Sequence, residues 1–358
     1  MKKRWKWFGI LGLMSIMVTI GLAEHANAKS GTPTQKDRVY IDFFSSTFGS
    51  GSYVLGTALE AISAKHHPYL RINNLETPGW VWHMRTIFAN PERHKTTILG
   101  GDPPTLSMAY AGKKPHYDKP LPVQQLKFLT TQFISNAFLV TLDTPKTIRE
   151  LDGKSIGFGR ATQMSWTIEP ETVLRKGWGI DFKSVYLGPN ESMQALLDGR
   201  VVACPAKFYS TGDLSGISPA GSLTTLQASG RPYYFISMGK PSTIAKASES
   251  SKIAMGADII PAGTLKNQPE PICVIQDVIG IMAHETFPED LAYEFTKLCL
   301  DYHKDFSKYH SRLGKLCIPS TIAYGWFEDE RHPGAIRAFE EAGIPMGHPE
   351  ERWAPWRK

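Results

Sequence analysis

The alternation of apolar and polar residues along the chain predicts short strands joined to amphipathic helices. Residues 38–44 alternate as a strand does, and in residues 53–65 apolar side chains recur every three to four positions, as in a helix. Small residues at 45–52 link the two and can cap the helix. A helix that starts after such a loop leaves backbone N–H groups unpaired, so an anion can bind in front of it.

The same order of elements recurs further along the chain. The predicted elements are a strand at 155–158, a loop at 159–163, a helix at 166–176, a strand at 184–187, a helix at 192–197 and a strand at 201–204. Strands that alternate with helices indicate an α/β fold with a mostly parallel sheet and helices on both faces. The Pro-rich, basic stretch at 103–122 is expected to be a long surface loop.

Two β-rich segments, 138–141 and 278–282, flank this second set of elements and have the pattern of a paired crossing between two lobes. We therefore predict a discontinuous lobe one, residues 37–138 and 277–358, and a lobe two at 139–276. A predicted helix from 288 to about 310 would pack on lobe one.

The N-terminus has the three parts of a secretory signal. Four basic residues precede an uncharged stretch at 7–22, and Ala26, Asn27 and Ala28 give the small-x-small pattern of a cleavage site. We expect residues 1–28 to be removed and the mature chain to start at Lys29. The alternative is an uncleaved anchor, although 16 uncharged residues are fewer than the roughly 20 that span a membrane.

Charge argues against nucleic acid as a partner. Cleavage removes four basic residues and Glu24, so the formal net charge of +6 falls to +3, and Lys and Arg are scattered among acidic residues. The four cysteines, Cys204, Cys273, Cys299 and Cys317, lack zinc-site spacing. Buried thiols explain them, and the alternative is a disulfide, best placed between Cys299 and Cys317.

The catalytic signatures are incomplete. Gly153-Lys154-Ser155 lacks the earlier glycine of a phosphate-binding loop, and residues 157–162 lack the third glycine of a dinucleotide site. His284-Glu285 lacks the second histidine of a zinc protease. We therefore expect a protein that is not an enzyme and that has no cofactor and no metal.

Several segments together resemble the TAXI family, the solute receptors of tripartite TRAP transporters, over nearly the whole mature chain. The most specific are Ile260-Pro261-Ala262-Gly263-Thr264, Phe287-Pro288-Glu289-Asp290-Leu291-Ala292-Tyr293, and His332-Pro333-Gly334-Ala335-Ile336-Arg337 with Glu341-Ala342-Gly343. Others are Gly51-Ser52-Tyr53-Val54-Leu55-Gly56, Thr77-Pro78-Gly79-Trp80 and Leu151-Asp152-Gly153-Lys154. The chain departs from the family at Arg160-Ala161-Thr162 and Ala206-Lys207-Phe208-Tyr209, so the ligand's identity cannot be transferred.

The resemblance implies a two-lobe periplasmic binding protein, type II-like, that closes over a small organic anion such as a carboxylate. It implies a monomer in the periplasm that delivers its ligand to the integral membrane subunits of a TRAP transporter. A ligand-sensing subunit of a signalling system is the alternative, and an exported enzyme on the same fold is a further one, since fold does not determine function.

The predicted ligand-binding residues come from both lobes. They are Ser50, Gly51, Ser52, Tyr53, Gly79, Trp80 and Asp102 from lobe one, and Arg160, Ala161, Thr162 and Tyr209 from lobe two. Arg160 is expected to pair with a ligand carboxylate, the alternative being a solvated surface arginine. Trp80 is expected to line the cleft and to favour a flat or apolar ligand, the alternative being that Trp80 and Trp82 pack in the core.

Overall fold

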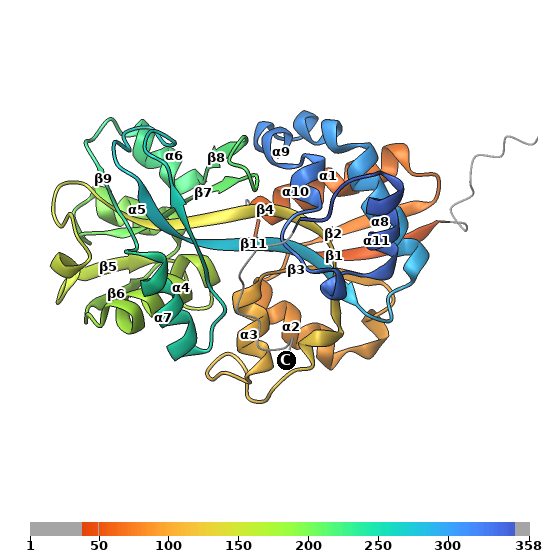
Figure 1. The fold of residues 1–358 in the computed structure, drawn as a ribbon, viewed down its shortest axis with the longest axis horizontal. Helices are drawn as coiled ribbons and strands as arrows, with labels where there is room; N and C mark the ends of the chain where they lie inside the picture. Colours follow the sequence, from red (N-terminus) through yellow and green to blue (C-terminus); the bar gives the residue numbers. More distant parts are fainter. Residues whose placement is uncertain (1–37, 49, 348–358) are drawn as a thin grey trace, which may run out of the picture.

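The computed structural model describes residues 38–48 and 50–347, which form two lobes side by side. In Figure 1, β1–β3, α1–α3 and α8–α11 make up one half, here called lobe one, and β5–β9 with α4–α7 make up the other, lobe two. The predicted signal at 1–28 and its cleavage site lie outside the described residues. Every helix in the described ranges is too short or too polar to cross a bilayer.

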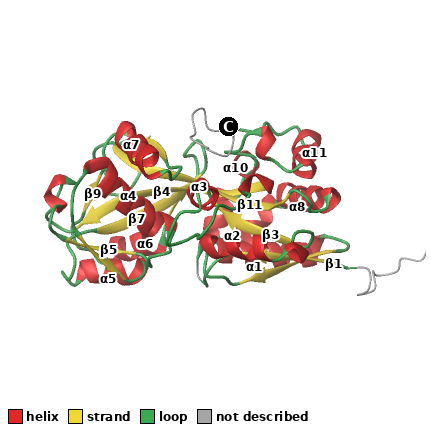
Figure 2. Ribbon diagram, turned by 90° about the horizontal axis from the view of Figure 1, so that it is seen from below, coloured by secondary structure: helices red, strands yellow, loops and turns green. Residues whose placement is uncertain are grey.

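The strands and helices alternate along the chain, as the α/β prediction requires. The strands are β1 (Val39–Phe44), β2 (Leu70–Leu75), β3 (Thr97–Gly101), β4 (Leu126–Thr141), β5 (Ser155–Phe158), β6 (Lys183–Tyr186), β7 (Cys204–Ser210), β8 (Ile217–Pro219), β9 (Tyr234–Ile236), β10 (Gly256–Ile260) and β11 (Ile272–His284). The helices are α1 (Gly51–His66), α2 (Trp80–Ala89), α3 (Pro103–Tyr110), α4 (Glu169–Thr172), α5 (Pro189–Leu197), α6 (Gly221–Ala228), α7 (Pro241–Ser251), α8 (Glu289–Asp301), α9 (Ser311–Leu316), α10 (Pro319–Ile322) and α11 (Pro333–Glu341). Figure 2 shows helices on both sides of the strands in each lobe.

The main sheet is mixed rather than mostly parallel. Its strand order is β2-β1-β3-β11-β4-β7-β8, with β10 on β11 and β9 on β4, and β5 and β6 form a separate pair. Among the described strands, the parallel pairs are β1 with β2 and β3, and β5 with β6, and Ile156 of β5 also forms a parallel bridge with Ala203. The other pairs are antiparallel because the chain leaves lobe one along β4 and returns along β11 in the opposite direction.

The two long strands β4 and β11 are the crossing between the lobes. They pair antiparallel from Ile275 opposite Ala137 to His284 opposite Leu126, and they run through both lobes in Figure 1. The predicted paired crossing is therefore present. The predicted lobe boundaries fall inside these two continuous strands, so the division at 138/139 and 276/277 stays a prediction.

Each lobe has an apolar core, and a third cluster continues across the crossing strands from Met84 in lobe one to Phe158 in lobe two. In lobe one, α1, α8 and α11 pack with β1 and β2 around buried side chains that include Phe43, Leu59 and Phe295. In lobe two, α5 and α6 pack on β7 and the outer end of β4, around Phe138 and Phe208. Almost every residue of β4 is buried, and the strand is paired with β11 on one edge and with β7 and β9 on the other.

Three local predictions need correction or refinement. The stretch 103–122 is not simply a surface loop, because it starts with α3, most of which is buried. Asp102 caps this helix by accepting a hydrogen bond from the Thr105 N–H (2.9 Å), and proline fits the first helical position. The strand predicted at 201–204 instead runs over β7, and the helix predicted at 288–310 ends at Asp301 before a 3-10 turn.

All four cysteines lie in the described ranges, and each is buried with a free thiol. Cys299 and Cys317 belong to the same apolar core of lobe one, yet they form no disulfide. The buried-thiol interpretation is the one that the structure supports.

Candidate functional site

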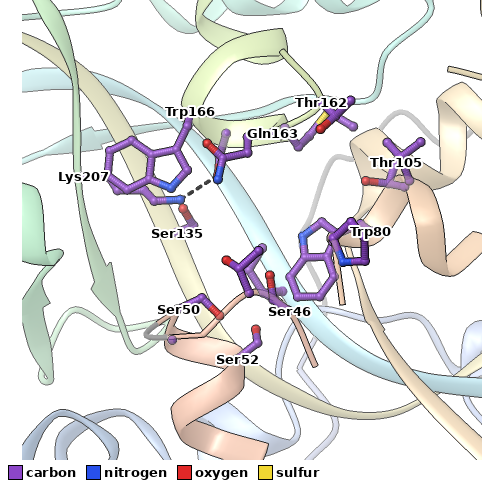
Figure 3. Close-up of a pocket in the computed structure, with 18 of the residues that line it drawn as sticks. Ser46, Ser50, Ser52, Trp80, Thr105, Ser135, Thr162, Gln163, Trp166 and Lys207 are labelled. Atoms are coloured by element: carbon purple, nitrogen blue, oxygen red, sulfur yellow. Dashed lines mark hydrogen bonds between the residues drawn. The ribbon is translucent and has the colours of Figure 1, made fainter. Parts of the chain in front are cut away.

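A cavity of about 110 Å³ lies between the two lobes, against the crossing strands β4 and β11. A cavity of comparable size can hold a ligand of roughly six non-hydrogen atoms, such as benzene. Figure 3 shows Trp166 and Gln163 of lobe two facing Ser46, Ser50 and Trp80 of lobe one across this space. Phe133 and Ile279, from β4 and β11, line it at the crossing.

The start of α1 forms one part of the lobe-one wall. The Ser50 hydroxyl accepts a hydrogen bond from the Tyr53 N–H (3.2 Å), and the Ser52 hydroxyl donates to the Gln132 side chain (2.6 Å). Gly51 lets the helix start approach the crossing, because a Cβ there would lie 3.0 Å from the Phe133 ring. The unpaired N–H groups of this 16-residue helix thus face the cavity together with serine hydroxyls.

Trp80, the first residue of α2, forms the rest of that wall. Its ring lies over Gly100, where a Cβ would come within 2.4 Å of the indole, so a larger residue at 100 would displace it. Behind the ring, His83 is fully buried, with one ring nitrogen 2.6 Å from the Thr77 hydroxyl and the other 2.7 Å from the Gly100 carbonyl. Burial lowers the pKa of His83 to about 4. The imidazole is therefore neutral at pH 7, and Trp80 rests on an uncharged support.

The lobe-two wall carries a charge. Lys207 on β7 is the cationic residue among those that line the cavity, and it is only 5% exposed. Its ammonium donates a hydrogen bond to the Ser165 hydroxyl (2.7 Å) and lies 4.3 Å from the centre of the Trp166 ring. The continuous helical run from Met164 to Trp178 holds these two partners in place.

The register of the sheet explains why Lys207 points inward. Lys207 pairs with Ala137 on β4, and Tyr209 pairs with Ser135, so all four side chains leave the same face of the sheet. The small side chains of Ala137 and Ser135 leave room for the long ones. An ammonium has three N–H donors, and one of them is satisfied by Ser165, which leaves donors for an anionic ligand.

Three buried carboxyl groups meet next to the cavity. Asp102 caps α3 in lobe one, Glu169 belongs to α4 in lobe two and Asp277 lies on β11, and an oxygen of each lies within 4.8 Å of the others. Burial raises the pKa of Asp102 to about 6, raises that of Asp277 to about 8, and raises that of Glu169 well above its usual range. The Lys207 charge opposes each of these shifts.

Comparison with protein families identifies the chain. The model of the NMT1-like family matches residues 46–343. The chain belongs to the NMT1-like family. A comparison with curated proteins gives no match.

The solved structures similar to this chain are remote from it in sequence. A TctC solute-binding protein from Polaromonas is 13% identical, with a TM-score of 0.47 over 77% of this chain and 88% of that one. MatC from Rhodopseudomonas palustris with bound malate is 13% identical, with a TM-score of 0.47 over 86% and 96%. An R. palustris protein with adipate is 13% identical, with a TM-score of 0.48 over 86% and 93%. The ligands named here are those of the solved proteins.

This NMT1-like chain therefore has an α/β fold of two lobes joined by two crossing strands. The family match does not single out the TAXI receptors.

Seven of the residues predicted from the NMT1-like chain's sequence line the cavity. These are Ser50, Gly51, Ser52, Gly79, Trp80, Thr162 and Tyr209. Four others do not line it. Tyr53 points toward the exposed Phe48 ring (5.3 Å), Asp102 lies in the carboxyl cluster, and Arg160 and Ala161 are exposed. The predicted pairing of Arg160 with a ligand carboxylate stays a prediction.

The sequence analysis missed the ionisable groups at the site and the indole that contacts the ammonium. Lys207, Trp166, Glu169 and Asp277 were not predicted as site residues, although Lys207 stands in a departure from the TAXI pattern. The available signal was a charged residue inside a strand whose other residues are apolar or small. Such a residue is expensive to bury unless a partner or a ligand satisfies it.

Proposed function

We propose that this chain is a periplasmic solute-binding receptor that captures a small, carboxylate-bearing organic solute between its lobes. The observation that carries the proposal is the buried Lys207 ammonium on the cavity wall, facing neutral hydroxyls and the α1 N-terminus. A carboxylate between them would accept hydrogen bonds from both lobes. Charge-assisted hydrogen bonds of this kind are about twice as strong as neutral ones.

The aromatic residues limit what else the ligand can be. Trp80, Trp166, Phe133 and Tyr209 surround the cavity, and Phe133 and Tyr209 contact each other with ring centres 4.5 Å apart. This surface suits an apolar or flat body attached to the carboxylate better than a second charged group. The cavity volume of about 110 Å³ suits a small body.

Contacts between the lobes fit a receptor that closes on its ligand. The Arg312 guanidinium of α9 donates to the Ser218 hydroxyl and to the Pro219 carbonyl of β8, both at 3.2 Å. Because these bonds join lobe one to lobe two, they exist only while the lobes are together. A ligand that touches both walls shifts the hinge equilibrium toward this arrangement.

The finer parts of the proposal rest on the sequence. The resemblance to the TAXI family makes the partner the membrane subunits of a TRAP transporter, to which the closed receptor delivers its solute. The mature chain would be a monomer that begins at Lys29, with lobe one at 37–138 and 277–358 and lobe two at 139–276. In this proposal the protein binds and does not catalyse.

The experiment first identifies the solute and then removes the Lys207 charge. Mass spectrometry of material released from the purified protein gives the solute class, and calorimetry then compares the wild type with Lys207→Met. Losing a charged hydrogen bond costs about 1.5–3 kcal/mol, so we expect the affinity to fall about tenfold to a hundredfold.

Arg160→Ala is the matched control, because it also removes a lobe-two cation but one that is exposed. The proposal expects little change in this variant. A large loss of affinity in Arg160→Ala and none in Lys207→Met would show that Arg160, and not Lys207, binds the anion. Release of only neutral or cationic solutes would contradict the proposal.

A further inference from the structure

The carboxyl cluster is unusual because its oxygens lack donors. Five of the six oxygens of Asp102, Glu169 and Asp277 have no hydrogen-bond partner in the geometry of the described residues, and all three residues are buried. One Asp102 oxygen accepts from the Thr105 N–H, the Trp80 indole lies near the same carboxyl group, and the Glu169 and Asp277 carboxyl groups lie against each other. Buried charges are normally paired or coordinate a metal, so this arrangement leaves a requirement unmet.

The Ser135 hydroxyl is a second indication of a bound ion. Ser135 lies opposite Asp277 in the antiparallel register of β4 and β11, so both side chains leave the same face of the sheet. Ser135 is only 1% exposed, and its hydroxyl has no hydrogen-bond partner among the described residues. This neutral oxygen without a partner, on the same face as Asp277, is available as a fourth ligand atom.

Charge and spacing define that ion. When an ion displaces the protons that the raised pKa values favour, the three carboxylates and the nearby Lys207 ammonium carry two net negative charges, which one divalent cation neutralises. The carboxylate oxygens lie within 4.8 Å of one another, and oxygens on opposite sides of a Ca²⁺ ion are about 4.6–5.2 Å apart. Mg²⁺ usually keeps several water ligands and is rarely held by protein oxygens alone, so a buried set of protein oxygens is more typical of Ca²⁺.

We propose that Asp102, Glu169, Asp277 and Ser135 bind a divalent cation of the Ca²⁺ type between the lobes. The ligands come from lobe one, lobe two and both crossing strands, so the ion ties together the parts that must meet when the receptor closes. It also neutralises the carboxylates that compete with the solute for Lys207. Solute and cation therefore bind with positive coupling, each raising the affinity for the other.

The first test uses the full mature chain without any solute. Protein stripped with a chelator and then dialysed against Ca²⁺ is expected to retain one ion per chain by elemental analysis and to melt several degrees higher, because an ion that binds only the folded state stabilises it. Tb³⁺, a luminescent substitute for Ca²⁺, should bind the same site. Trp80 lies near enough to Asp102 to influence its pKa and should therefore sensitise the luminescence.

Variants distinguish a cluster that binds an ion from one that is held together by shared protons. Asp277→Asn and Glu169→Gln should abolish the Ca²⁺-induced rise in melting temperature and the Tb³⁺ signal, whereas Asp143→Asn, at an exposed carboxylate, should change neither. If the wild type retains no ion and Asp277→Asn raises its melting temperature, the cluster is held together by shared protons and the proposal is wrong. Should either variant fail to fold, the ion count and Tb³⁺ binding of the wild type still decide.

This test is separate from that of the proposed receptor function. The ion count and the melting curves need no solute, so they can fail while Lys207→Met still weakens solute binding. The coupling gives an additional measurement: saturating Ca²⁺ should tighten the solute in the wild type and leave its affinity unchanged in Glu169→Gln.

Discussion

The two walls of the cavity are built on different principles. The lobe-one wall comes from two helix starts, those of α1 and α2, and it offers hydroxyls, backbone N–H groups and an indole without a formal charge. The lobe-two wall depends on Lys207 in the middle of a strand, held by Ser165, which is 42 positions away in the chain. The lobe-one wall thus depends on local structure, whereas in the lobe-two wall a long-range contact positions the charged group.

The difference teaches which wall is sensitive to which change. The lobe-one wall depends on helix caps and on the neutral His83 beneath Trp80. Low pH and mutations of the caps should therefore destabilise it. The lobe-two wall depends on the environment of one ammonium, so removal of that charge should damage recognition rather than the fold. The predictions that follow test this division, beginning with the largest expected effect.

Acid should destabilise the fold through His83. Its pKa is about 4 in the folded protein against an ordinary value near 6.5, so the folded state binds fewer protons between these values. The stabilising contribution is complete above pH 6.5 and is lost as the pH falls to 4. The shift corresponds to about 3 kcal/mol, which urea unfolding at pH 7 and pH 4 should show as a difference between the wild type and His83→Gln.

The buried carboxyl groups change the stability in the opposite direction: because their pKa values are raised in the folded protein, they favour the folded state as the pH falls. The comparison of the two proteins cancels that contribution, since both contain the cluster. His303→Gln, outside the cavity, is the control and should follow the wild type. An equal pH dependence in His83→Gln and the wild type would exclude His83 as the acid-sensitive group.

The second effect concerns the cap of α1. Ser50→Ala removes the acceptor for the Tyr53 N–H, and such caps contribute about 0.5–2 kcal/mol to the free energy of unfolding. The melting temperature should fall by a few degrees. Ser46→Ala is the matched control, because Ser46 also lines the cavity but caps no helix, and it should leave the melting temperature unchanged. Equal losses in both variants would mean that the cap contributes nothing.

The same division explains how far the sequence could predict this molecule. The strand at 38–44, the helix after it and the crossing between the lobes followed from periodicity, because such patterns are local or depend on the order of elements. The helix at α3 was missed because its prolines suggested a loop, although proline is well suited to a first helical turn.

The missed site residues share one property, which is that tertiary structure alone brings them together. Asp102, Glu169 and Asp277 come from three distant segments, and no spacing in the sequence indicates that they meet. Arg160 was predicted as the anion partner from its position after a strand, yet the cation that lines the cavity comes from the next strand but one, β7. Which side chain reaches a shared cavity depends on register and on lobe packing.

The smallest expected effect on stability, and the one most specific to the walls, concerns Trp80. The indole is half-buried over Gly100 on the cavity side, while its neighbour Trp82 is 37% exposed and packs on Phe44 with ring centres 5.1 Å apart. Because solute binding changes the surroundings of a cavity residue, intrinsic fluorescence should shift when solute is added. Trp80→Phe should remove most of this shift and change the melting temperature little, since phenylalanine can still cover Gly100.

Trp82→Phe is the matched control, because it removes a tryptophan from the same helix at a position outside the cavity lining. It should keep the fluorescence response to solute. If the response survives in Trp80→Phe and disappears in Trp82→Phe, the solute does not touch the lobe-one wall at the indole. A fall of several degrees in the melting temperature of Trp80→Phe with the response intact would make Trp80 a core residue, and the preference for a flat or apolar solute would lose its basis.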